Sequence, residues 1–392
     1  MRYILVGTWL MAGLSAMSQS AWSFTTGPGR QVRVTDVVEV DDGVLLSITN
    51  YNVDSLPVTR SFISKLDVFG LLTGTSRVWN DTDATSVWSL QDDWDGSGYM
   101  ALADLWPSVG DSGFYSLRFA SDLTHLDPTI YRCADLSQPF LDNSFRLDNG
   151  DVIIAGVGYG TSGFPISAIQ LIRIDQNGDS LDSWREDNTG FLAARDVIEF
   201  GPDSIMVSAF GIPVTTPFQS GIASYSKFNA DLDLVGGFAG GTLDGSNDPL
   251  NFQNNISEHL HLSLLPSGNL IVSGRRGSGS SFRTAVQKIT SGGNWLASFT
   301  PQSEFQLDHP AALRSSALVG NEVLVASMEN YFYGAEVGTP FQPDMSNRIR
   351  VHKLDTALNP ICTNLVDGFA ENAYYWLDRI KPTSDGGYIL LV

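Results

Sequence analysis

Short apolar runs that directly follow a polar turn recur along most of the chain. Each run is mainly aliphatic, and the turn before it contains Gly, Asp, Asn or Ser. The seven copies lie within residues 42–46, 98–102, 149–154, 203–207, 268–272, 321–325 and 385–391. A continuous apolar run of this kind is typical of a strand that is buried on both faces.

A second pattern follows each of the first six runs. It consists of a basic residue, an apolar residue and usually a turn former, and successive copies are 53 to 65 residues apart. The basic residues are Lys65, Arg118, Arg173, Lys227, Lys288 and Lys353. The fullest copy, Ile174–Leu181, supplies the Asp, Asn and Gly that a tight hairpin needs. We expect each copy to end a strand, with its basic side chain paired to an acidic group on an adjacent strand or facing solvent.

A third apolar segment lies upstream of each turn and is often opened by Asp, as in residues 36–38, 196–198 and 378–380. One unit therefore reads strand, turn, strand, loop, strand, turn, strand, and a helical period of 3.6 residues is hard to find. The pattern predicts an all-β protein, a β-propeller with four-stranded antiparallel blades. We expect seven blades, six complete and the seventh partial, with six blades as the alternative. A β-sandwich array is the structural rival, although it does not need the same turn chemistry in every unit.

Both ends of the chain bear on how such a ring closes. Residues 1–18 have the features of a secretory signal peptide: basic Arg2, an apolar stretch over Ile4–Leu14, and small residues at a cleavage site, Ala16–Ser18. The stretch is too short to span a bilayer. We therefore expect a secreted or cell-surface protein without a membrane span, and a propeller domain over residues 19–392. This domain ends within an apolar run, so either residues 24–35 supply its missing strands or it is truncated at the C-terminus.

The net charge narrows the choice of partners, and the cysteine positions bear on disulfide pairing. The chain carries 43 Asp and Glu against 23 Lys and Arg, a net charge of −20. Such a surface repels phosphate backbones, so nucleic acid is not an expected partner. Cys133 and Cys362 fall in different units. We expect two separate thiols unless the fold happens to bring these cysteines together.

Two segments resemble a known group of repeat proteins. Thr383–Leu390 resembles the T-x-D-G-G-Y-I-L signature of secreted repeat proteins of Bacteroidota, and Lys353-Leu354-Asp355 is similar to their K-L-D-x-x-G strand. The resemblance covers roughly residues 36 to 392, with degenerate copies. It implies a β-propeller and export, and it implies no agreed activity.

The loop after each apolar run is the best candidate for a binding surface. These loops occupy equivalent positions in a propeller and therefore share one face. They begin with Tyr51, Trp106, Tyr159, Phe210, Arg275 and Tyr331. Aromatic side chains stack on sugar faces and anchor protein partners. The alternative is that these side chains pack between neighbouring blades at the ends of strands.

Metal sites are weaker candidates. His259 and His261 are two residues apart on a predicted strand, so both rings point to one face, but His261 matches the repeat position of Asp196 and Asn143, which favours a structural role. Two acidic turns have oxygen ligands at alternating positions without the terminal Glu of a calcium loop, so Ca²⁺ is a weak alternative and no cofactor is expected. Their residues are Asp175, Asn177, Asp179 and Asp182 in one turn, and Asp92, Asp93 and Asp95 in the other.

Three functions remain open. The sequence contains no G-x-S-x-G, H-E-x-x-H or phosphate-loop motif, so it favours a non-catalytic binding module for a protein or a glycan. One alternative is a polysaccharide-active enzyme, a glycoside hydrolase or lyase, which needs carboxylates placed across the bond that breaks. The other is a structural surface or adhesion repeat.

Overall fold

The structure is a computed structural model, and it describes 17 separate stretches of the chain. These are residues 4–8, 23–25, 31–51, 60–78, 84–92, 97–106, 113–132, 140–159, 167–188, 191–202, 204–212, 222–239, 256–276, 283–301, 308–329, 348–367 and 377–392. Every element in these stretches is a β-strand, and no helix among them is long and apolar enough to cross a membrane.

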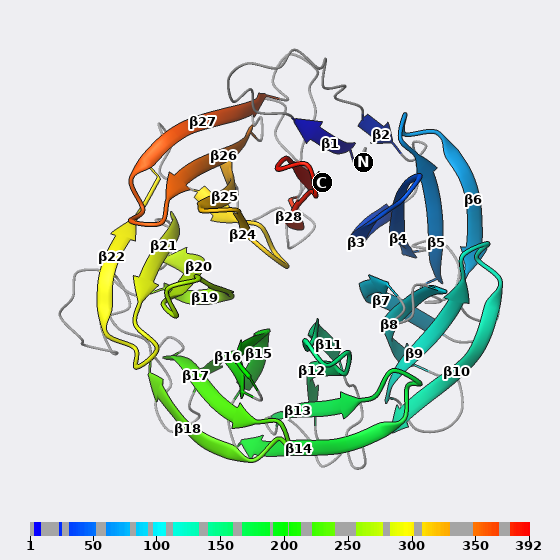
Figure 1. Cartoon of the computed structure of the whole chain (residues 1–392), viewed down its shortest axis with the longest axis horizontal. Helices are drawn as coiled ribbons and strands as arrows, with labels where there is room; N and C mark the ends of the chain where they lie inside the picture. Colours follow the sequence, from blue (N-terminus) through cyan, green and yellow to red (C-terminus); the bar gives the residue numbers. More distant parts are fainter. Residues whose placement is uncertain are drawn as a thin grey trace.

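The strands form antiparallel sheets arranged radially around a central axis (Figure 1). Blade 1 consists of β3 (Gln31–Val40), β4 (Gly43–Tyr51), β5 (Arg60–Asp67) and β6 (Leu72–Arg77). Blade 2 consists of β7 (Ala84–Asp92), β8 (Gly98–Trp106), β9 (Gly113–Ala120) and β10 (His125–Arg132). Blade 3 consists of β11 (Phe140–Arg146), β12 (Val152–Tyr159), β13 (Ser167–Ile174) and β14 (Ser180–Asn188).

The remaining blades repeat this order from the axis outwards. Blade 4 consists of β15 (Phe191–Gly201), β16 (Ser204–Ile212), β17 (Ile222–Asn229) and β18 (Leu234–Ala239). Blade 5 consists of β19 (Ile256–Leu264), β20 (Leu270–Arg276), β21 (Arg283–Ile289) and β22 (Trp295–Phe299). Blade 6 consists of β23 (Asp308–Pro310), β24 (Ser316–Val319), β25 (Glu322–Glu329), β26 (Arg348–Asp355) and β27 (Pro360–Asp367).

One further sheet, the closing sheet, joins the two ends of the chain. Its strands are β28 (Arg379–Pro382), β29 (Tyr388–Leu391), β1 (Ile4–Thr8) and β2 (Ser23–Thr25). The predicted propeller is therefore confirmed, but the described residues form six complete blades rather than seven. Val6 pairs with Leu390, so a strand from the predicted signal peptide takes the third place in this sheet. A chain cleaved after Ser18 would lack β1.

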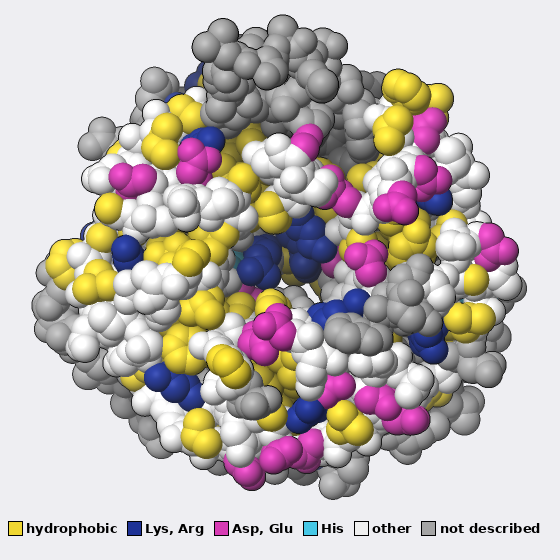
Figure 2. All heavy atoms as spheres, in the orientation of Figure 1, with side chains coloured by type: hydrophobic (Ala, Val, Ile, Leu, Met, Phe, Trp, Pro, Cys, Tyr) yellow, Lys and Arg dark blue, Asp and Glu magenta, His cyan; other side chains and the backbone are white. Residues whose placement is uncertain are grey.

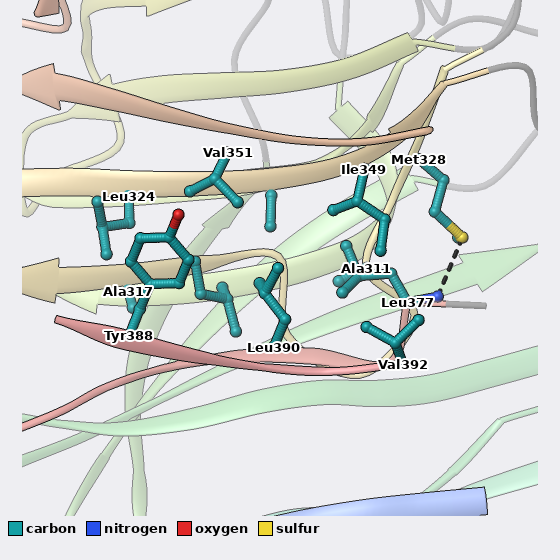
Figure 3. Packing of buried hydrophobic residues seen from close by; sticks show 12 residues of the cluster. Ala311, Ala317, Leu324, Met328, Ile349, Val351, Leu377, Tyr388, Leu390 and Val392 are labelled. Atoms are coloured by element: carbon teal, nitrogen blue, oxygen red, sulfur yellow. Dashed lines mark hydrogen bonds between the residues drawn. The ribbon is translucent and has the colours of Figure 1, made fainter. Parts of the chain in front are cut away.

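The core lies between neighbouring blades, because each sheet buries both of its faces. In the predicted apolar runs, Leu45 and Leu46 of β4 are both fully buried, although their side chains point to opposite faces. Figure 3 shows one such interface, where Leu324 and Ile349 of blade 6 face Leu390 of the closing sheet. The prediction that these runs are buried on both faces is confirmed.

The turns between third and fourth strands follow the predicted chemistry. In blade 3 the Oδ1 atom of Asp175 accepts hydrogen bonds from the N–H groups of Asn177 and Asp179, both at 2.8 Å. Gly178 completes the turn with a φ of 85°, which a side chain disfavours. Asp175 is thus part of a hairpin turn, as predicted.

The repeated basic residues hold neighbouring segments together. As predicted, several of them pair with an acidic side chain at the start of the adjacent second strand: Lys65 with Asp42 (2.9 Å), Arg173 with Asp151 (2.6 Å), and Lys353 with Glu322. Others reach a turn of the next blade. Lys227 Nζ donates to the carbonyl of Ser291 (2.6 Å), and Lys288 Nζ donates to that of Thr356 (2.8 Å).

One of the two cysteines, Cys362, lies in the described part of the structure. Cys362 of β27 is a free and partly buried thiol. Cys133 lies outside the described residues.

Candidate binding pocket on the propeller axis

The two faces of the ring are built differently. The turns between first and second strands and between third and fourth strands lie on one face, which we call the tight-turn face. The second strands end on the opposite face, which we call the loop face. A pocket of about 1480 Å³ opens on the tight-turn face, around the axis. Side chains from all six blades and from the closing sheet line it.

Basic side chains gather around the axis of this acidic protein. Figure 2 shows Lys and Arg at the central opening, with Asp and Glu both beside them and over the rest of this face. On the closing sheet, Lys381 Nζ lies 2.7 Å from Asp36 Oδ1 and donates to the carbonyl of Val37 at 2.7 Å. Arg379 Nη1 lies 3.5 Å from the same carboxylate oxygen, and its Nη2 donates to the carbonyl of Trp88 at 3.3 Å.

The charges of this cluster perturb one another. Burial works against ionisation of Asp36, but Arg379, Lys381 and the N–H of Leu90 outweigh it and hold the pKa of Asp36 below its ordinary value. Burial lowers the pKa of Lys381, and the nearby Arg379 and Arg314 add to this effect while Asp36 opposes it. The carboxylate of Asp36 is therefore the anchor that holds two cations at the axis.

Arg314 joins the cluster because the innermost strand of blade 6 is interrupted. The chain between β23 and β24 leaves blade 6 and pairs with the closing sheet, where Ile380 N–H donates to Arg314 O at 3.0 Å. The Arg314 guanidinium donates through Nη2 to the carbonyl of Leu262 at 3.0 Å. Its Nη1 lies 3.8 Å from Asp196 Oδ1, which is beyond hydrogen-bond distance.

A belt of polar side chains surrounds the cluster at one repeat position, which is a β-bulge in blades 1 to 5. Its members are Asp36, Ser89, Asn143, Asp196, His261, Ser315 and Asp378. Several accept a hydrogen bond from the backbone of the next blade: Asp36 from Leu90 (2.8 Å), Asp196 from Leu262 (2.7 Å), and His261 from Ser315 (3.0 Å). The belt therefore ties the innermost strands into a ring.

The residue three positions beyond each belt residue faces the pocket mouth. In blade order these residues are Glu39, Asp92, Arg146, Glu199, Leu264 and Leu318, followed by Lys381 of the closing sheet. All except Arg146 line the pocket. The belt position is polar in every sheet, whereas this wall position is acidic, basic or apolar according to the blade.

Most of the pocket's carboxylates already have partners. Glu39 Oε2 accepts from the N–H of Ser384 (2.7 Å), Glu199 Oε2 accepts from that of Asp148 (2.9 Å), and Asp42 is paired with Lys65. Asp92 differs: desolvation raises its pKa, although Arg146 and Lys381 oppose the shift. The first two carboxylates connect neighbouring blades, and Asp92 stands in the pocket itself.

The predicted aromatic ring lies at the other end of the axis. Tyr51, Trp106, Tyr159 and Phe210 are at or near the ends of β4, β8, β12 and β16, on the loop face, and their side chains lie outside the described part of the structure. Arg275 of β20 is buried, with 8% of its surface exposed. Tyr331 lies outside the described residues.

The candidate metal ligands fall into different surroundings. His261 is buried in the belt, where its Nδ1 accepts a hydrogen bond from Ser315 N–H, as its repeat register predicts for a structural side chain. His259 lies on β19, and its side chain is not described. Asp93 and Asp95 are outside the described residues. Among the residues that are described, no three His, Cys, Asp or Glu side chains come together as metal ligands.

Sequence reasoning missed the cations at the axis. Asp36, Asp196 and Asp378 were visible as residues that open a strand, and aligning the units on them would have placed Glu39, Glu199 and Lys381 at one shared position. No repeat signal marks Arg314, because it lies where blade 6 departs from the pattern.

Comparisons with known proteins give distant structural matches only. No family model and no curated protein matches the chain. Solved structures similar to it include an α-L-arabinofuranosidase from Fusarium graminearum, with a TM-score of 0.46, 11% identity, and coverage of 86% of this chain and 93% of that one. The GH43_1 enzyme from Xanthomonas citri, complexed with xylotriose, matches with a TM-score of 0.41 and 11% identity, over 78% of this chain and 89% of that one. Puromycin hydrolase matches with a TM-score of 0.47 and 11% identity, over 91% of this chain and 58% of that one. At TM-scores below 0.5 and identities near 11%, these matches carry no conclusion about fold or function.

Proposed function

We propose that this propeller is a non-catalytic binding module that takes a glycan into the axial pocket. The observation that carries the proposal is the pocket itself, which is lined from every sheet and, at about 1480 Å³, exceeds the roughly 300–1,000 Å³ of ordinary small-molecule sites. It has room for an oligosaccharide. A ligand in this position contacts the whole ring at once.

The chemistry of the wall suits a sugar. Tyr99 and Phe145 offer aromatic surface, and Ser121 and Ser263 offer hydroxyl groups beside the charged side chains. Sugars combine apolar ring faces with many hydroxyls, so they are bound by aromatic rings together with polar side chains. Glu39 and Glu199 accept backbone hydrogen bonds, which favours a structural role for these two carboxylates over a part in glycosidic hydrolysis.

A glycan array followed by calorimetry on the purified protein tests the proposal, with one variant for each face. Tyr99→Leu removes the pocket hydroxyl and ring but keeps an apolar side chain, and Trp106→Leu makes the matched change on the loop face. We expect the first variant to lose glycan affinity and the second to keep it.

The converse result would place the site on the loop face and refute the proposed pocket. Release of shortened glycan products during the same incubation would replace binding with the alternative of a glycoside hydrolase or lyase.

A further inference from the structure

We propose that the ligand of the axial pocket is an acidic glycan, whose carboxylate or sulfate group binds beside Lys381 and Arg314. This inference rests on the proposed glycan-binding function and adds the chemical class of the ligand. It is drawn from how the charges are layered at the axis and from the hydrogen-bonding capacity that the cations retain.

At the axis, the basic side chains line the pocket and the carboxylates lie deeper in the protein. Lys381 and Arg314 line the pocket and keep 25% and 23% of their side-chain surface exposed. The nearby carboxylates of Asp36, Asp196 and Asp378 are at most 1% exposed and do not line it. A ligand entering the pocket meets the basic groups first, and the carboxylates behind hold those groups in place.

Both cations retain donors for a ligand. The Lys381 ammonium has three N–H donors, and among the described residues it uses Asp36 and the Val37 carbonyl. Arg314 has five N–H donors, and the described acceptors at hydrogen-bond distance are the carbonyls of Leu262 (3.0 Å) and Ser316 (3.4 Å). Arg314 forms a long ion pair with Asp196, at 3.8 Å and without a hydrogen bond, so an anion in the pocket would supply a hydrogen-bonded partner.

Five carboxylates also line the pocket, those of Glu39, Asp41, Asp42, Asp92 and Glu199, and most of them have described partners. Glu39 and Glu199 accept hydrogen bonds from backbone N–H groups, and Asp42 is neutralised by Lys65 at 2.9 Å. Burial raises the pKa of Asp92 and so works against its ionisation, although the charges of Arg146 and Lys381 oppose this shift. An acidic sugar therefore finds its counter-charge beside the closing sheet and its apolar contacts along the opposite wall.

Calorimetric titration with three oligosaccharides of matched length tests this inference: an oligogalacturonate, a sulfated galactan fragment and a neutral galactan fragment. We expect an acidic ligand to bind about tenfold or more tightly than the neutral one, as a charge-assisted hydrogen bond provides. The better of the two acidic ligands identifies carboxylate or sulfate as the group that binds.

Charge variants locate the site. Lys381→Gln and Arg314→Gln should each lower the affinity for the acidic ligand by about tenfold and leave the affinity for the neutral ligand unchanged. Arg348→Gln is the matched control, because it removes one charge near the loop face, where Arg348 pairs with Asp367 at 3.2 Å. Lys381→Arg keeps the charge beside Asp36 and should keep the acidic preference, so it separates lost binding from lost folding.

The outcomes distinguish the two proposals. Equal affinity for acidic and neutral ligands, with Tyr99→Leu still abolishing both, overturns the acidic preference and leaves the glycan-binding function standing. Absence of binding to all three ligands and across a glycan array overturns the proposed function and this inference with it.

Discussion

Asp308 is a buried carboxyl whose replacement by Asn should change how the stability of the propeller depends on pH. It is the first residue of β23 and lies directly opposite Glu329 of β25, with exposed fractions of 1% and 0% for the two residues. Burial is the main cause that raises the pKa of Asp308 to about 7, and the charge of Glu329 adds to it. Hydrogen bonds from Ser327 and Thr284, and the charge of Arg283, act in the opposite direction.

The sign and size of the effect follow from linkage. A carboxyl whose pKa is higher in the folded than in the unfolded state contributes no penalty below the unfolded value; the penalty grows as pH rises from the unfolded to the folded value and is complete above the folded value. A rise from 3.8 to about 7 corresponds to roughly 4 kcal/mol at full ionisation. About 3 kcal/mol of this develops between about pH 5 and about pH 8. Asn at this position keeps the shape and does not titrate.

Urea unfolding of both proteins at these two pH values measures the effect. Relative to the wild type, Asp308→Asn should gain about 3 kcal/mol in free energy of unfolding between the lower and the higher pH. Asp231→Asn is the control, because that side chain is 83% exposed, and its difference from the wild type should stay within about 0.5 kcal/mol at both pH values. Parallel pH profiles for Asp308→Asn and the wild type would show that burial does not keep this carboxyl protonated, and would refute the reasoning.

Three further changes test the contacts that hold the ring together, each read as the free energy of unfolding in urea. Asp36→Ala strips Lys381 and Arg379 of their shared carboxylate and should cost about 3–5 kcal/mol, and a loss below 1 kcal/mol would mean that solvent replaces it. His261→Ala leaves the Ser315 N–H without its acceptor and should cost about 1–3 kcal/mol. An unchanged free energy of unfolding would show that this hydrogen bond does not stabilise the ring. Phe228→Ala empties a fully buried site between blades 3 and 4 and should cost about 3–5 kcal/mol. A loss as small as that of a surface substitution would contradict this packing.

The sequence predicted those parts of the fold that every unit repeats. The apolar run around Leu45, the turn at Asp175 and the pairing of Lys65 with Asp42 all follow from local rules of burial, turn conformation and cross-strand charge. The position of β1 could not be predicted in this way, because its pairing with β29 joins opposite ends of the chain and no local rule sets it.

The candidate site was predicted less well, for a different reason. Strand periodicity shows which residues share a face of a sheet, but it does not show which end of a propeller axis is hollow. The aromatic positions at the loop face, such as Trp106, were therefore visible in the sequence, whereas the pocket on the tight-turn face became visible only in three dimensions. Arg314 reaches the axis through the interrupted strand of blade 6, which is a departure from the repeat rather than part of it.

Under the proposed function, the belt serves stability and the wall of the pocket serves recognition. A side chain that ties one blade to the next meets the same backbone groups in each blade, so a repeated fold tends to keep one chemistry there, as Asp36 and Asp196 do. A side chain that meets a ligand faces a molecule without the repeat symmetry of the ring, so equivalent positions have to differ. Glu39 and Glu199 at this repeat position also bond to a neighbouring sheet, whereas the change from Leu264 to Lys381 suits the asymmetric ligand of the proposed function.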